Sequence, residues 1–393
     1  MKNKQPVDFY KLLYYSTFVI CMINFLRPYS LWGVYDLIGP YINLLSIGLS
    51  LVSFVFIIPR YEGHNALLMI FILLFVLIVG INSDKFLFLW TSFVLIVGAK
   101  DISFHSIVKV HFVVSLSFCL LNVFGYELGL LKQANNYLGD LREGFGGDLV
   151  ERLHFGYGWA TDFANHVFFI LLDYWILHNG KLSIMGYLLF LFVPPFIIIY
   201  TDTRLATGCI ILLMLSSIYL SRKEKKIKQI SSITKKVLIF SLPFFAVISI
   251  WATIDYEPTN LYWFAANIVL SNRLQYGADA INEFGISWLG QPVEMHGAID
   301  AGGMAEYNFV DCSYVQFLIR YGVVFISLIV FLFIRMSLSA VSRDDRVLLF
   351  AIMIAGVSGI IAQFVFDYRY CVLFLALMAS HRQIKDGQIM CQS

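Results

Sequence analysis

Five arginines are the residues in this sequence whose type and position suggest chemistry. They lie beside or within long apolar runs, where a charged side chain costs roughly 2.5–3.5 kcal/mol and usually has a function. A guanidinium group is planar and can donate two parallel hydrogen bonds to one phosphate or carboxylate group. We therefore predict that these side chains hold an anionic group: Arg152, Arg204, Arg273, Arg320 and Arg369.

Arg320 belongs to a polar stripe within "VDCSYVQFLIRYGVVF", residues 310–325. Ser313, Gln316 and Arg320 recur at i, i+3 and i+7, which places them on one face of a helix. At 1.5 Å per residue the stripe descends roughly 10 Å from the membrane surface. Two interpretations stay open: the stripe lines an outward-facing pocket that holds an anion, or Arg320 pairs with a carboxylate of a neighbouring helix.

Membrane helices must position these side chains. Of the 393 residues, 59% are hydrophobic and 14% are charged, whereas soluble proteins carry about 25% charged residues. Because about 17–25 apolar residues cross a bilayer as a helix, we predict an all-α, polytopic bundle of about twelve transmembrane helices. It forms a single membrane domain, residues 1–393. The predicted spans are 11–27, 39–58, 66–82, 86–99, 103–124, 162–178, 183–200, 205–221, 236–253, 312–334, 346–366 and 369–380.

Lysine and arginine are distributed unequally between the two predicted sides. Lysines concentrate in the loop 222–236, and basic loops mark the cytoplasmic side, so both termini are predicted to be cytoplasmic. The outer side is richer in arginine and carries two long loops, 126–161 and 255–311. Helical spacing of apolar residues within 261–284 predicts helical structure lying on the membrane surface.

Several other classes of site are excluded by the residue patterns. Six cysteines occur singly, and no paired CxxC, HExxH, GxxxxGK[ST] or GxGxxG segment is present. We predict no metal, no cofactor and no nucleic-acid partner. Within the spans, Lys109 and Asp173 lie at similar depth on neighbouring helices, so we predict a structural ion pair between them.

Four segments on the outward side resemble, in their order, signature segments of the O-antigen and capsular repeat-unit polymerase (Wzy) family, within the O-antigen polymerase and ligase superfamily. They are "ERLHFGYGWATDFAN", "TDTRLATG", "NRLQYGADAINEFGISWLGQ" and "VDCSYVQFLIRYGVVF". The resemblance covers roughly residues 151–393 and depends on the order and setting of the segments.

This resemblance implies a glycosyltransferase that joins undecaprenyl-pyrophosphate-linked oligosaccharide units at the outer face of the bacterial cytoplasmic membrane. The five arginines would bind pyrophosphate, whose negative charge grows as it leaves. Asp311 and His296 would be candidate bases for the acceptor hydroxyl, while Tyr157, Trp159 and Tyr314 would contact sugars. Expected partners are the lipid-linked oligosaccharide, membrane lipids, a flippase and a chain-length regulator.

Two alternatives stay open. A ligase of related architecture would move a finished glycan onto another acceptor, but such ligases carry a histidine and an asparagine where "VDCSY" stands here. A lipid-oligosaccharide flippase or other transporter would also have many spans. Long outer loops without symmetry between the two halves of the chain argue against a transporter.

Overall fold

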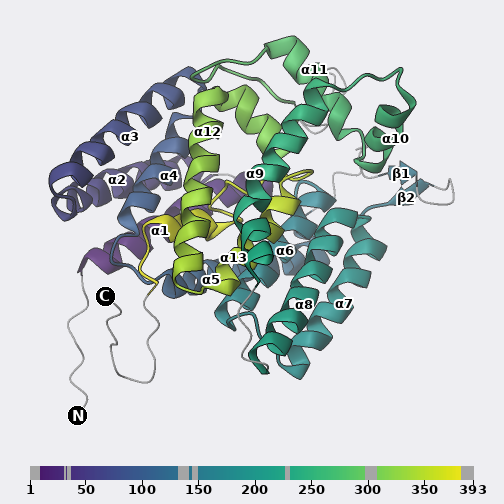
Figure 1. Ribbon diagram of the computed structural model, residues 1–393, viewed down its shortest axis with the longest axis horizontal. Helices are drawn as coiled ribbons and strands as arrows, with labels where there is room; N and C mark the ends of the chain where they lie inside the picture. Colours follow the sequence, from purple (N-terminus) through teal and green to yellow (C-terminus); the bar gives the residue numbers. More distant parts are fainter. Residues whose placement is uncertain are drawn as a thin grey trace.

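The structure, a computed structural model, describes residues 9–30, 32, 37–131, 141–143, 149–225, 231–296 and 308–381. As predicted, the fold is all-helical (Figure 1), apart from one short hairpin of strands β1 (Leu141–Glu143) and β2 (Leu149–Glu151). The α-helices are α1 (Phe9–Leu26), α2 (Gly39–Ile57), α3 (Gly63–Asn82), α4 (Phe86–Gly98), α5 (Phe104–Glu127), α6 (Ala160–Leu177), α7 (Ile184–Thr201), α8 (Arg204–Lys225), α9 (Ser232–Ile254), α10 (Leu261–Val269), α11 (Arg273–Phe284), α12 (Ser313–Ser342) and α13 (Arg346–Ser358). The short 3-10 helices include η1 (Arg27–Tyr29), η3 (Ile58–Arg60) and η5 (Val372–Leu377).

Within the described residues, eight helices are long and apolar enough to cross a membrane: α1, α2, α3, α5, α7, α8, α9 and α12. The helices α4 and α13 are apolar but only 13 residues long. Large apolar side chains such as Leu44, Phe71 and Phe192 are exposed along α2, α3 and α7. Contiguous apolar surface of this extent is unfavourable in water and suits lipid. The chain is a membrane protein.

The predicted span at 369–380 is wrong, whereas each of the other predicted spans overlaps one helix. Only the six residues of η5 are helical there, and a membrane helix needs about 20 residues. The segment is apolar because it lies in the protein core, where it contacts α4, α5 and α12. Its end pairs with the start of α5, since Phe104 donates its backbone N–H to the carbonyl oxygen of Ser380 at 2.9 Å.

The helix α6 lies at the centre of the bundle, and its side chains Phe168, Phe169 and Trp175 are fully buried. Asp173 of this helix pairs with His111 of α5. The predicted pair of Asp173 with Lys109 is therefore wrong. Residues two apart on a helix point in nearly opposite directions, so burying His111 turns Lys109 to the exposed face.

The helix α12 is broken at Gly322, whose φ of 87° and ψ of 169° are not helical. The break frees backbone groups, which pair with the segment 285–291 that follows α11; we call this segment the 285–291 turn. Three backbone hydrogen bonds join it to α12: Val323 N to Ser287 O (3.0 Å), Val324 N to Trp288 O (3.2 Å) and Gln291 N to Arg320 O (3.1 Å). Figure 1 shows the chain running from α11 toward the end of α3 before it returns to α12.

Gly322→Ala is expected to destabilise the protein. A Cβ atom at this position would lie 2.6 Å from the carbonyl oxygen of Trp288 and 2.7 Å from the amide nitrogen of Gly290. At φ 87° and ψ 169°, a region that essentially only glycine adopts, any residue with a Cβ also adds a backbone cost of about 1–3 kcal/mol. We expect a lower thermal midpoint for the variant in detergent, followed by tryptophan fluorescence. Gly48→Ala in α2, where a Cβ meets no atom within 4 Å, is the control, and equal midpoints for both variants would contradict this prediction.

Candidate functional site

Four connections meet at one end of the bundle, which we call the pocket end. They are the segments 152–159 before α6, 202–203 between α7 and α8, 308–312 before α12, and 359–367 after α13. Backbone N–H of Leu153 donates to the carbonyl oxygen of Tyr200 at 2.7 Å. The hydroxyl of Ser313 donates to the carbonyl oxygen of Ala362 at 2.6 Å. These bonds hold the connections against one another where the helices begin or end.

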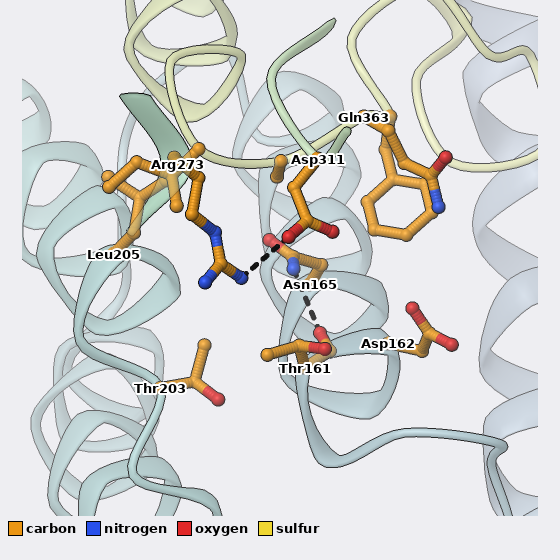
Figure 2. Close-up of a pocket in the computed structure, with 11 residues that line it drawn as sticks. Thr161, Asp162, Asn165, Thr203, Leu205, Arg273, Asp311 and Gln363 are labelled. Carbon is orange, nitrogen blue, oxygen red and sulfur yellow. Dashed lines mark hydrogen bonds and ion pairs between the residues drawn. The ribbon is translucent and has the colours of Figure 1, made fainter. Parts of the chain in front are cut away.

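A cavity of ≈ 50 Å³ lies among these connections. Figure 2 shows side chains reaching it from α6, from the α7–α8 turn, from α11 and from the segments next to α12 and α13. Its polar lining residues are Thr161, Asp162, Asn165, Thr203, Arg273, Asp311 and Gln363. Since a cavity of about 10–15 Å³ in this measure already holds one water molecule, the cavity has room for a hydroxyl group or for phosphate oxygens.

Arg273 and Asp311, both predicted as site residues, form an ion pair in this cavity, with Nη2 of Arg273 2.8 Å from Oδ2 of Asp311. Nη1 of Arg273 donates to the carbonyl oxygen of Ser271 at 2.8 Å. Its Nε is buried and has no hydrogen-bond partner in the described part of the chain. Figure 2 shows the guanidinium group reaching toward Asp311. The arginine therefore keeps a spare donor while its charge is balanced by one carboxylate.

Arg152 and Arg204, also predicted, lie beside the cavity at the α7–α8 turn. Nε of Arg152 donates to the carbonyl oxygen of Thr201 at 2.8 Å, and its Nη2 donates to Oγ1 of Thr203 at 3.4 Å. Thr203 lines the cavity, so its bond to Arg152 places Arg152 next to the cavity. Arg204 begins α8, with Nε 3.6 Å from Oδ1 of Asp202. The pocket end thus gathers three of the five predicted arginines.

Two polar side chains of α6 complete the cavity. Asp162 is 5% exposed, and its carboxylate makes no hydrogen bond or ion pair with the residues that the structure describes. Asp311 and Arg369 act on it electrostatically. Nδ2 of Asn165 donates to the carbonyl oxygen of Thr161 at 2.8 Å, while its Oδ1 is buried without a partner in the described chain. Both side chains have spare hydrogen-bonding capacity at the cavity.

The predicted polar stripe of α12 does not line the cavity. Ser313 and Gln316 are buried and bond to the segment after α13 instead. Nε2 of Gln316 donates to Oε1 of Gln363 at 2.9 Å, and Gln363 reaches the cavity. The stripe therefore orients a lining residue. Arg320, the last residue of the predicted stripe, is absent from the lining and lies at the break in α12.

Arg369 and His296 also lie outside the cavity lining. Nε of Arg369 donates to both carboxylate oxygens of Asp367, at 2.6 and 2.7 Å, and its Nη1 donates to the carbonyl oxygen of Phe25 at 2.9 Å. The guanidinium bonds to groups inside the protein, so the predicted contact with pyrophosphate is not supported. The His296 side chain is 41% exposed, and its Nε2 lies 4.0 Å from Oε2 of Glu294.

Two of the predicted sugar-contacting rings are unavailable to a ligand. Tyr157 is fully buried, and its hydroxyl lies 2.6 Å from Nδ1 of His166. Tyr314 is also fully buried and donates its hydroxyl to the carbonyl oxygen of Gly356 at 2.7 Å. Both rings pack in the core, which corrects their assignment. Trp159 is half-buried at the N-terminus of α6.

Sequence reasoning missed Asp162, Asn165 and Gln363. An acidic residue in the first turn of a helix usually interacts with the helix dipole, so Asp162 carries no distinctive signal. The available signal is the i, i+3 spacing of Asp162 and Asn165 inside "ERLHFGYGWATDFAN", which places both on one helix face.

Comparison with known proteins gives no further guide to this site. No family model, no curated protein and no solved structure matches the chain.

Proposed function

We propose that the protein is an oligosaccharide repeat-unit polymerase of the Wzy type. It would transfer a growing glycan from undecaprenyl pyrophosphate to the next lipid-linked unit. The resemblance of four sequence segments suggests this class. The observation that supports it best is the Arg273–Asp311 ion pair, in a cavity that also contains Asp162, at one end of a membrane bundle.

In the proposed step, a hydroxyl oxygen of the acceptor glycan bonds to the anomeric carbon of the donor. The bond between this carbon and a pyrophosphate oxygen breaks, and its electron pair leaves with undecaprenyl pyrophosphate. Arg273 stabilises the growing negative charge through its spare donor, with Arg152 and Arg204 nearby. The cavity then surrounds the reacting oxygens.

The hydroxyl proton would pass to Asp162. A bonded cation favours the charged form of a carboxylate, so Asp311 stays charged beside Arg273. Asp162 has no bonded cation among the described residues and is the better proton acceptor. Asp311 then positions Arg273 against the leaving group.

We also propose that the pocket end faces the outside of a bacterial cytoplasmic membrane. The described ends of the chain lie at the opposite end of the bundle. There the hydroxyl of Tyr10 donates to the carbonyl oxygen of Gly98, and Nδ1 of His381 lies 3.9 Å from Oδ2 of Asp345. Arg222 lies near the end of α8, which starts at the pocket end, and Lys235 and Lys236 lie in the first turns of α9. Basic loops favour the cytoplasmic side, and both termini would lie there.

Deletion of the gene in its own host tests this function. We expect the deletion strain to display single glycan repeat units and no long polymer, because export of each unit continues while joining stops. Re-expression of the chain should restore the ladder of chain lengths. The accumulated glycan is sized by gel electrophoresis and by mass spectrometry of the lipid fraction.

The same experiment separates the two alternatives. A ligase mutant would accumulate long lipid-linked chains, and a flippase mutant would trap single units on the cytoplasmic side. Either result, or an unchanged ladder, would contradict the polymerase proposal.

A further inference from the structure

A second group of positive charges lies outside the cavity, at the break in α12. Arg320 lies two residues before Gly322, and Lys85 lies in the turn between α3 and α4. The 285–291 turn contacts both elements: a Cβ on its Gly290 would lie 3.2 Å from the carbonyl oxygen of Arg320 and 3.3 Å from that of Val79 in α3. The fold therefore brings the end of α3 to the break in α12.

Arg320 has no counter-charge in contact with it among the described residues. Its guanidinium makes no hydrogen bond or ion pair with any residue that the structure describes, although its Nε is buried. The carboxylate partner that the sequence left open is thus not found in the described chain. A half-buried guanidinium with unused donors needs an external partner, because a buried donor without one costs free energy.

Lys85 adds a second positive charge at the same place. Partial burial, and then the charge of Arg320, lower the pKa of Lys85 from its ordinary value. The adjacent Asp84 opposes this shift. Two cations close enough to repel each other are stabilised when an anion binds between them.

Exposed apolar side chains lie on the three elements that meet here, α3, α12 and the 285–291 turn. Ile81 at the end of α3 is 67% exposed, Trp288 in the 285–291 turn is 72% exposed, and Val324 after the break is 40% exposed. Tryptophan favours the boundary between lipid and water. Further along α3, Phe71 and Leu74 are also exposed. A headgroup held by the cations would place its hydrocarbon chain along α3.

We propose that Arg320 and Lys85 form a second anion site, which binds the phosphate-bearing headgroup of a lipid whose chain lies along α3. Phosphate oxygens would accept charge-assisted hydrogen bonds from both side chains. A polymerase must hold two lipid-linked substrates at once. The cavity site would hold one pyrophosphate group and the Arg320–Lys85 site the other. This last assignment rests on the proposed function, whereas lipid binding does not.

Native mass spectrometry of the purified full chain in detergent tests the site. The probes are undecaprenyl phosphate, phosphatidylglycerol and inorganic pyrophosphate. We expect the double variant Arg320→Gln, Lys85→Gln to bind undecaprenyl phosphate at least about tenfold more weakly, because it loses two charge-assisted contacts. The double variant Arg335→Gln, Lys109→Gln changes the charge equally elsewhere and should bind as the wild type does. Since the guanidinium of Arg320 makes no hydrogen bond or ion pair within the described part of the chain, Arg320→Gln should keep the wild-type melting temperature.

Trp288→Ala separates a lipid-borne phosphate from a free one. It should weaken the binding of undecaprenyl phosphate and leave that of inorganic pyrophosphate unchanged. Unchanged binding of undecaprenyl phosphate to the Arg320→Gln, Lys85→Gln variant would overturn the site. If Trp288→Ala weakens the binding of pyrophosphate and of undecaprenyl phosphate equally, the assignment of the site to a lipid is overturned.

The second-substrate role has its own readouts. Phosphatidylglycerol binding as tightly as undecaprenyl phosphate would overturn this role and support recognition of lipid phosphate in general. A host deletion strain that still makes normal polymer would end the proposed function, while loss of lipid binding in the double variant would still support the site.

Discussion

Asp162→Asn is expected to lower kcat for glycan polymerisation by about 10²- to 10⁴-fold, the usual contribution of a general base, while the protein stays folded. Asparagine keeps the shape of the side chain, but its amide group cannot take up the hydroxyl proton of the acceptor. Asp162 makes no hydrogen bond or ion pair within the described chain, so its replacement breaks no internal contact. The measurement is the initial rate of product formation in liposomes at saturating lipid-linked substrate.

Two further aspartates serve as comparisons. Asp279→Asn, on the exposed face of α11, should leave kcat unchanged. Asp311→Asn removes the carboxylate that positions Arg273, so we expect KM to rise as well as kcat to fall. If Asp162→Asn polymerises at the wild-type rate and Asp311→Asn is inactive, the proton passes to Asp311 and the role given to Asp162 is wrong.

Arg369→Met is expected to destabilise the protein by about 3–5 kcal/mol, because it leaves a buried carboxylate without its cation. Asp367 is 4% exposed and accepts hydrogen bonds from Arg369 at 2.6 and 2.7 Å. The variant also loses the bond from Nη1 to the carbonyl oxygen of Phe25. We expect a strongly reduced yield of folded protein and a lower thermal midpoint in detergent.

Arg346→Met is the matched control. It removes an ion pair with Asp344 at 2.9 Å, in which the Asp344 side chain is 61% exposed, and exposed pairs contribute about 0–1 kcal/mol. Adding Asp367→Leu to Arg369→Met should recover stability, because neither charge of the buried pair remains. An Arg369→Met protein that melts like the wild type but makes no polymer would instead support the pyrophosphate contact predicted from the sequence.

The helices were largely predictable because long apolar runs have few alternatives. A run such as that of α3 must bury its backbone polar groups in a helix if it is to lie in lipid. The failure at 369–380 has the same origin: an apolar run is compatible with lipid or with a protein core, and only packing against α4, α5 and α12 distinguishes them. Gly322 ends the first part of α12 because the 285–291 turn approaches its backbone too closely for any side chain.

The candidate site was predictable only in part. Arg152, Arg204, Arg273 and Asp311 were predicted from charge beside apolar runs and from the resembling segments, and the structure places all four at the pocket end. Arg369 carries the same signal, yet its donors bond to Asp367 and the backbone. Residue type cannot show whether an arginine has an internal partner, because this depends on residues distant in sequence.

The sequence by itself determined that this protein lies in a membrane and where most of its helices lie. The low charge and the long apolar runs are properties of composition and residue order. Tertiary structure alone decided which polar groups share a cavity. Asp162, Arg273 and Asp311 lie on separate parts of the chain, and Asp173 pairs with His111 and not with Lys109. Helix rotation and packing select these partners, because a rotation of one or two residues turns a side chain from the core to lipid.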